Sequence, residues 1–184
     1  AYYGGHFGTN NDNHFSLFSA SGMDFIVVYL EFDPLANPTV LAWADGVLKT
    51  YSNRRAIVVS HYLIDTGNPA PFGSQGQATY NALKGNPNLF LMLAGHIQEE
   101  GRRTDIFNGN TVHTVLADYQ GRANGGNGWL RTLEFSPANN QIRFRTYSPW
   151  LNQFETAADS EFTLSYNMSP VNPVNQPPSV NEGP

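Results

Sequence analysis

The sequence predicts an α/β fold in which strand–helix units are followed by an antiparallel meander. Residues 55–60 and 88–94 are short apolar runs bounded by turn residues, a pattern typical of strands that are buried on both faces. In the first half, segments with helical spacing alternate with such strands, which indicates βαβ units and a parallel sheet. In the second half, turns alone separate the strands, so we expect antiparallel pairing there.

Local patterns define the elements of the first half. Residues 14–19 (HFSLFS) alternate polar and apolar side chains, as a half-buried strand does. Asn37 suits a helix N-cap and Pro38 the first helical position, and the apolar spacing carries this helix to about Tyr51. A Pro/Gly loop at 67–73 precedes the second helix. The elements expected in this half are strands at 14–19, 23–32, 55–60 and 88–94 and helices at 38–51 and 74–84.

Turn residues divide the second half into short strands. Residues 108–110 (NGN) and 137–140 (PANN) are typical of hairpin connections. The strands expected here are 102–107, 111–118, 129–135, 141–147 and 161–166. All elements belong to one well-cored domain, because 184 residues leave little room for two.

Composition limits the kinds of protein that this sequence encodes. The formal net charge of −5 argues against a general nucleic-acid binder, which needs a basic surface. No apolar run approaches the roughly 18 residues of a membrane span, so we expect a soluble domain. Because there is no cysteine, disulfides, a thiol nucleophile and thiolate zinc sites are excluded. We expect a secreted bacterial protein whose leader has been removed before Ala1.

The composition changes near Asn167, and this change divides the sequence into two parts. We expect a globular domain over residues 1–167 and a Pro/Asn-rich linker over residues 168–184 towards a further module. The end of the linker (NQPPSVNEGP) resembles the lead-in to small β-sandwich modules, of the polycystic-kidney-disease or cadherin-like kind, in large exported bacterial proteins. A frayed terminus is the alternative.

Two histidines stand at the tips of the buried strands. His61 follows the first of these strands and His96 the second, and each comes directly after a small residue, Ser60 or Gly95. In open α/β sheets the chemistry lies beyond the carboxyl ends of the strands. A histidine there can titrate near neutral pH or bind a metal. We expect the two rings to converge on one pocket; alternatively, each ring caps a strand end by hydrogen bonding.

Three segments resemble the closing motifs of the calcineurin-like metallophosphoesterases. They are residues 58–63 (VVSHYL), 91–105 (LMLAGHIQEEGRRTD) and 115–137 (VLADYQGRANGGNGWLRTLEFSP), and the resemblance extends over residues 10–167. It implies a portion of a four-layer α/β/β/α sandwich. It also implies hydrolysis of phosphoric esters at a two-metal centre.

The resemblance implies roles for single residues as well. His61 and His96 match the family's ligands for one metal ion, and Gln98 stands where the family has a histidine for the other. Glutamine is a poor replacement for imidazole on a transition metal. The family's upstream motifs, Asp-x-His, Gly-Asp and Gly-Asn-His-[Asp/Glu], are absent from this sequence. We therefore expect a divalent transition metal (zinc, manganese or iron) at an incomplete site.

Other side chains are weaker candidates. Asp65 would orient an imidazole, act as an acid or base, or cap a loop. Arg102 would meet an anionic ester or form an ion pair, and Tyr119 and Asn124 would line the rim of the substrate site. His113 has polar neighbours in its strand, so we expect it on an open face of the sheet.

We expect a hydrolase that acts on ester bonds, in which the two histidines hold a metal whose bound water becomes the nucleophile. One alternative is an esterase or glycosidase that combines a histidine with Asp65, Glu99 or Glu100. A catalytically incomplete fragment or binding module is another. The expected partner is a small-molecule or polymeric ester, with no nucleic acid or membrane. An exposed sheet edge favours a homodimer.

Overall fold

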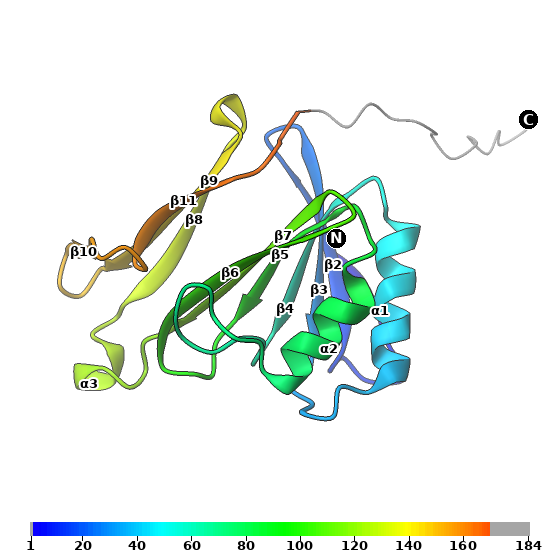
Figure 1. Cartoon of the computed structure of the whole chain (residues 1–184), viewed down its shortest axis with the longest axis horizontal. Coiled ribbons are helices and arrows are strands. Elements are labelled where there is room, and N and C mark those ends of the chain that lie inside the picture. Colours follow the sequence, from blue (N-terminus) through cyan, green and yellow to red (C-terminus); the bar gives the residue numbers. More distant parts are fainter. Residues whose placement is uncertain (1, 170–184) are drawn as a thin grey trace, which may run out of the picture.

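The computed structural model describes residues 2–169 and consists of two β-sheets with helices on one side (Figure 1). The strands are β1 (Tyr3–His6), β2 (His14–Ala20), β3 (Met23–Leu30), β4 (Arg55–Ser60), β5 (Leu89–Ala94), β6 (Glu99–Phe107), β7 (Asn110–Asp118), β8 (Leu130–Ser136), β9 (Gln141–Ser148), β10 (Gln153–Glu155) and β11 (Glu161–Ser165). The helices are α1 (Pro38–Thr50), α2 (Ser74–Leu83), the short α3 (Ala123–Gly126) and the 3-10 turn η1 (Pro137–Asn139). The predicted mixed α/β class is confirmed.

The first sheet has the order β1-β2-β3-β4-β5-β7-β6. Its central strands β3, β4, β5 and β7 run parallel, and β1, β2 and β6 pair antiparallel at its two sides. The predicted βαβ units are therefore present as β3-α1-β4 and β4-α2-β5. The predicted antiparallel meander is divided between the two sheets. β6 and β7 pair antiparallel as expected, but they belong to the first sheet, where β7 is parallel to β5. The second sheet is antiparallel and is built around β9, which pairs with β8, β10 and β11.

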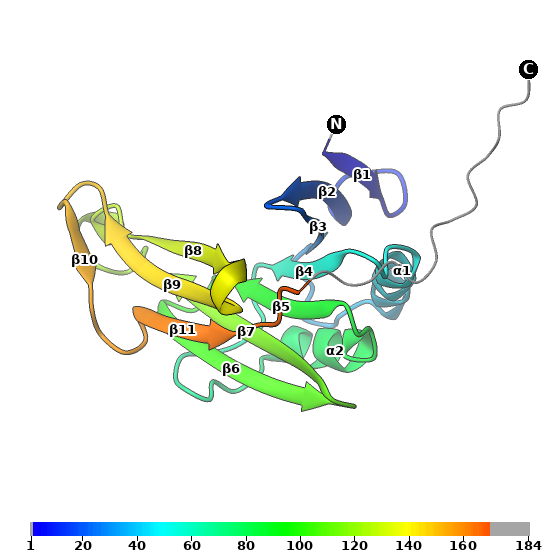
Figure 2. The same ribbon diagram turned by 90° about the horizontal axis from the view of Figure 1, so that it is seen from above.

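The two sheets and the helices stack in three layers. Figure 2 shows α1 and α2 on one face of the first sheet and the second sheet on the other. Ile26 and Val28 of β3 pack in the core against the helices, whereas Phe25 and Val27 pack in the core between the sheets. Because parallel strands are covered on both faces, they are apolar throughout, which explains the continuous runs in the sequence.

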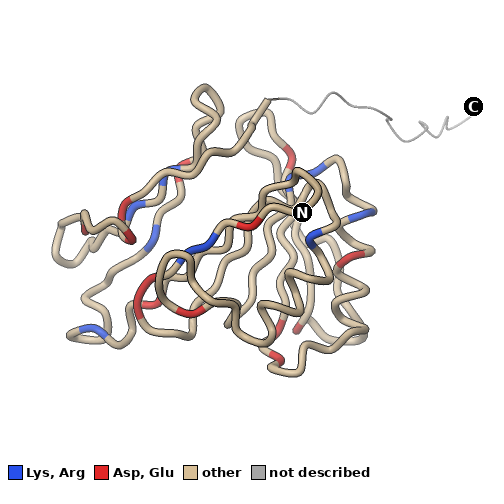
Figure 3. Tube along the Cα trace, in the orientation of Figure 1, with Lys and Arg blue, Asp and Glu red and all other residues tan. Residues whose placement is uncertain are grey.

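The outer face of the second sheet is polar. Arg143 pairs with Glu161, and Arg145 pairs with Glu134, across neighbouring strands. Figure 3 shows charges of both signs mixed along this sheet. An antiparallel sheet with one solvated face has this character. Residues 2–169 thus form three layers, α/β/β, and the four-layer sandwich is not seen within them.

The helices begin and pack as local chemistry requires. The Asn37 side chain accepts a hydrogen bond from the N–H of Thr39 (3.0 Å), and a proline occupies the first helical position of α1. In α2, a Cβ atom added to Gly76 would lie 1.8 Å from the carbonyl oxygen of Leu63. Glycine at this position therefore lets α2 lie directly against the segment that follows His61.

The structure contains two strands that were not expected, and it places one side chain differently from the prediction. β1 and β10 were not predicted, and β6 begins three residues earlier than expected. His113 is only 5% exposed, so its expected place on an open face is wrong. The second sheet covers that face of β7, and the Nε2 atom of His113 lies 3.2 Å from the carbonyl oxygen of Ser165 in β11.

Met168 and Ser169 end the described part of the chain. Met168 packs in the core between the sheets, and the carbonyl oxygen of Ser169 accepts a hydrogen bond from Arg55 (2.7 Å). Most of the expected linker, residues 170–184, lies outside the described residues, so the domain boundary stays a prediction. None of the helices in residues 2–169 is long and apolar enough to cross a membrane.

Candidate functional site

His61 and His96 meet at the carboxyl edge of the first sheet. His61 directly follows β4, and His96 follows β5 after Gly95. β4 and β5 are adjacent and parallel, so their ends lie side by side. The Nδ1 atom of His96 is 2.8 Å from the Nε2 atom of His61, and the ring centroids are 4.7 Å apart. The structure thus brings the two predicted residues into direct contact, with both side chains exposed.

The turn that carries His96 is strained. The N–H of Ile97 donates to the carbonyl oxygen of Gly95 (2.9 Å), which closes a three-residue turn around His96. His96 has a φ of 72° and Glu99 a φ of 93°, a region that side chains other than glycine rarely adopt. Each such residue costs about 1–3 kcal/mol and needs surrounding contacts to hold it. The turn over residues 95–99 therefore depends on its neighbours.

Aromatic side chains orient the two imidazoles. Phe32, just beyond β3, stacks on His96 (centroids 5.6 Å apart) and meets His61 edge-on (5.5 Å). Tyr62 lies 5.3 Å from the His96 ring. Its hydroxyl donates to Asp65 (2.8 Å), and this hydrogen bond, together with partial burial, raises the pKa of Tyr62 above its ordinary value. The rings are thus fixed from the side and open towards solvent.

The facing nitrogens fit two ligands of one transition metal ion. Two nitrogens bound at about 2.0–2.1 Å to a tetrahedral ion lie about 3.3 Å apart, so a shift of about 0.5 Å would suffice. Within residues 2–169, however, no group of three His, Cys, Asp or Glu side chains is placed to hold a metal. The described residues therefore do not fit a complete two-metal centre, and a role of the two histidines as metal ligands stays a prediction.

Gln98 and Asp65 lie near the histidines in the chain but have other contacts. Gln98 is exposed, and its side chain passes over Gly121, where a Cβ atom would lie 2.0 Å from the amide oxygen. Asp65 accepts the Tyr62 hydrogen bond, and its carbonyl oxygen lies close to Gly101 at the start of β6. The roles predicted for these two side chains stay predictions.

The expected substrate-binding residues contact the second sheet and its loops. Arg102 stacks over the Phe162 ring (4.0 Å) and pairs with Asp159. Tyr119 is buried. Asn124, in α3, is exposed. Its side chain donates a hydrogen bond to the side chain of Asn127, which follows α3 (2.8 Å). Within residues 2–169, none of these three side chains forms a hydrogen bond, ion pair or ring contact with His61 or His96, so contact with a substrate stays a prediction.

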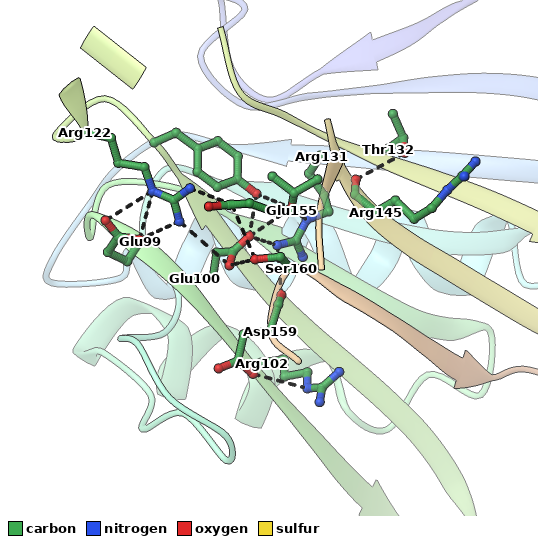
Figure 4. A network of polar contacts seen from close by, with 12 residues as sticks. Glu99, Glu100, Arg102, Arg122, Arg131, Thr132, Arg145, Glu155, Asp159 and Ser160 are labelled. Carbon is green, nitrogen blue, oxygen red and sulfur yellow. Dashed lines mark hydrogen bonds and ion pairs between the residues drawn. The ribbon is translucent and has the colours of Figure 1, made fainter. Parts of the chain in front are cut away.

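A buried polar network beside the site was not predicted (Figure 4). Its centre is Glu100, which forms an ion pair with Arg131 and accepts hydrogen bonds from Tyr119 (2.8 Å), Thr146 (2.9 Å) and Ser160 (2.6 Å). Burial alone would raise the pKa of Glu100, but the hydrogen bonds and the arginine outweigh it and lower that pKa. Glu100 is therefore held as a carboxylate. Adjacent glutamates in an otherwise weakly charged sequence were the only local sign of this network.

Comparisons with known proteins place the fold. No protein family model matches the chain. The chain is 36% identical over 183 residues to the uncharacterized protein YvnB of Bacillus subtilis (strain 168), a match that covers 92% of this chain and 14% of that protein. The chain thus spans a small part of this relative.

Two solved structures share the fold at low sequence identity. One is GAP50, the anchor in the inner membrane complex of Plasmodium (TM-score 0.52, 14% identity, 87% of this chain and 57% of that chain). The other is a dimetal phosphatase from Danio rerio (TM-score 0.52, 13% identity, 85% of this chain and 62% of that chain). The chain has a fold like that of a dimetal phosphatase and spans less than two thirds of each structure.

Proposed function

We propose that this protein is part of a metal-dependent phosphoric ester hydrolase and that His61 and His96 are two of its metal ligands. The observation that carries the proposal is the pair of imidazole nitrogens, 2.8 Å apart, at the exposed carboxyl edge of the first sheet. The likeness to the fold of a dimetal phosphatase supports it. Function must still be argued from the site, because one fold hosts many activities.

In this proposal each described residue has a limited task. His61 and His96 hold the ion, while Phe32 and Tyr62 keep the rings in place. A bound divalent metal lowers the pKa of a coordinated water to about 7 and so supplies hydroxide at neutral pH. The remaining ligands, and the fourth layer of the sandwich, would come from outside residues 2–169.

Binding of Co²⁺ tests the metal ligands without relying on activity. We expect the 184-residue chain to bind Co²⁺ with a visible absorption spectrum of imidazole coordination, and His61→Ala or His96→Ala to weaken binding at least tenfold. His6→Ala is the matched control, because His6 is an exposed histidine in β1, three strands away from β4. Equal Co²⁺ affinity in all four proteins would contradict the assignment.

Hydrolysis assays test the reaction class. With Mn²⁺ or Zn²⁺ added, we expect the chain to release nitrophenol from bis(p-nitrophenyl) phosphate faster than the free ion does, and His96→Ala to lose this excess. Hydrolysis of nitrophenyl acetate that persists in a chelator would favour an esterase instead. A metal-bound chain without phosphoesterase turnover would contradict hydrolysis by the two histidines alone and would favour a catalytically incomplete module.

A catalytically incomplete binding module is the second candidate. The observation in its favour is that the described residues offer two imidazoles and no third metal-ligating side chain of the His, Cys, Asp or Glu type beside them. A glycosidase is less well supported, because it needs two free carboxyl groups. Here Glu100 forms an ion pair with Arg131, and Glu99 forms one with Arg122. The ester substrate, secretion and pairing of two copies through a sheet edge stay predictions.

A further inference from the structure

A single arginine connects the strained turn to the second sheet. The Arg122 side chain donates to the Glu99 carboxylate from Nε (3.0 Å) and from Nη2 (2.6 Å). Its Nη1 atom donates to Glu155 of β10 (2.6 Å). One guanidinium thus bridges a carboxylate at the start of β6 and a carboxylate of the second sheet (Figure 4).

The Arg122 side chain is itself held in place. Its guanidinium lies over the Tyr119 ring (4.7 Å), and the Tyr119 hydroxyl donates to Glu100. The N–H of Arg122 donates to the carbonyl oxygen of Tyr119 (3.0 Å), and its own carbonyl oxygen accepts from Gly126 (3.2 Å). The Arg122 side chain is 17% exposed and the Glu99 side chain 53%, so the arginine is largely buried while the carboxylate of Glu99 stays accessible to solvent. An ion pair contributes most to stability when two N–H groups of an ordered arginine bind the same carboxylate, because this geometry also fixes the orientation of the carboxylate.

Apart from Arg122, three contacts hold the turn. They are the stacking of Phe32 on His96, the hydrogen bond from the N–H of Gly95 to the carbonyl oxygen of His61 (3.0 Å) and the pairing of Glu99 with Asp118. His96, Gln98 and Glu99 are exposed, and only Ile97 packs against a buried cluster. Two of these residues have a positive φ, which costs free energy that the surrounding contacts must offset. Arg122 contacts Glu99, which is one of the two residues with a positive φ in this turn. It is therefore placed to keep the turn, and with it the His96 ring, in the observed conformation.

We propose that Arg122 is a positioning residue: by joining Glu99 to Glu155, it couples the docking of the second sheet to the orientation of His96 against His61. The geometric part of this proposal concerns the imidazole pair alone. The consequence for a metal ion rests on the proposed function, because it assumes that the pair binds one.

Imidazole ¹⁵N–¹H correlation spectra test the geometric part. We expect Arg122→Gln to shift or broaden the signals of His61 and His96, while Arg122→Lys, which keeps the charge, has a smaller effect. Arg143→Gln is the matched control, since it removes an ion pair on the outer face of the second sheet. Melting temperatures of all variants show how much of any change comes from lost stability.

The same proteins test the functional part. We expect Arg122→Gln to weaken Co²⁺ binding at least fivefold and Arg143→Gln to leave it unchanged. Unaltered His61 and His96 signals in Arg122→Gln would overturn the positioning role. A wild-type chain that binds no Co²⁺ would refute the metal proposal, yet the spectra would still decide the role of Arg122. Should Arg122→Gln not fold, Glu155→Gln weakens the link from Arg122 to the second sheet, keeps the contact between Arg122 and Glu99, and is expected to alter the same two signals.

Discussion

At the scale of single residues, His113 shows how a neighbouring layer changes a side chain. Its Nδ1 atom lies 2.9 Å from the Thr104 hydroxyl and its Nε2 atom 3.2 Å from the carbonyl oxygen of Ser165. Burial lowers the pKa of His113, and the hydrogen bond to Ser165 offsets this only in part. The polar neighbours of His113 in β7 suggested that it lies on an open face of the sheet. The sequence of β7 does not show that the second sheet packs over this face.

The lowered pKa predicts how stability depends on pH. Between the folded pKa and the unfolded value of about 6.5, the unfolded chain binds more protons at His113 than the folded chain does. The contribution of His113 to the free energy of unfolding is therefore complete above a pH of about 6.5, and it is lost as the pH falls towards the pKa of the folded state. The loss is at most about 1.4 kcal/mol per pH unit.

Urea unfolding at several pH values between about 5 and 8 measures this contribution. We expect the free energy of unfolding to fall more steeply with decreasing pH in the wild type than in His113→Gln, which does not titrate. Parallel curves for the two proteins would show that His113 does not contribute in this way.

At the scale of elements, the local patterns predicted most of the fold and the positions of the two histidines of the candidate site. The N-cap at Asn37, the central strands and the two histidine tips appear where the sequence placed them. β1 was missed because two glycines and a register shift interrupt its alternation. The contacts of Arg122 were missed because its partners lie 23 and 33 residues away, and local patterns do not report on pairing over such separations.

The packing of α2 gives a prediction for this scale. A methyl group at Gly76 would meet the Leu63 backbone, which cannot rotate away, so α2 would have to move off the segment beside His61. We expect Gly76→Ala to destabilise the fold by about 1–3 kcal/mol. Gly46→Ala in α1 is the control, because nothing lies within 4 Å of its added Cβ. There we expect a gain of about 0.5–1 kcal/mol. Chemical denaturation that ranks the two variants the other way would contradict the close packing.

At the scale of the whole molecule, the two sheets are joined by an apolar core and by a polar network at one end. Phe25, Leu91 and Phe144 belong to the core between the sheets. Glu100 in the first sheet and Arg131 in the second form an ion pair whose side chains are 8% and 7% exposed. A buried pair of this kind is costly to break, because removing one partner leaves the other charge without compensation.

Glu100→Ala tests the contribution of this ion pair to the contact between the sheets. We expect a loss of about 3–5 kcal/mol in the free energy of unfolding. Glu161→Ala, which removes the more exposed pair with Arg143, is expected to cost less than about 1 kcal/mol. Amide hydrogen exchange would locate the effect of Glu100→Ala in β8 and β9. Similar losses in both variants would mean that the polar network does not join the sheets.

Anomalous diffraction from a crystal of the 184-residue chain soaked in Zn²⁺ tests the central claim most directly. Our account predicts a peak at the zinc absorption edge about 2 Å from both the Nε2 atom of His61 and the Nδ1 atom of His96. A map in which zinc occupies other histidines, such as His6 or His14, while the region between His61 and His96 has no peak, would contradict it.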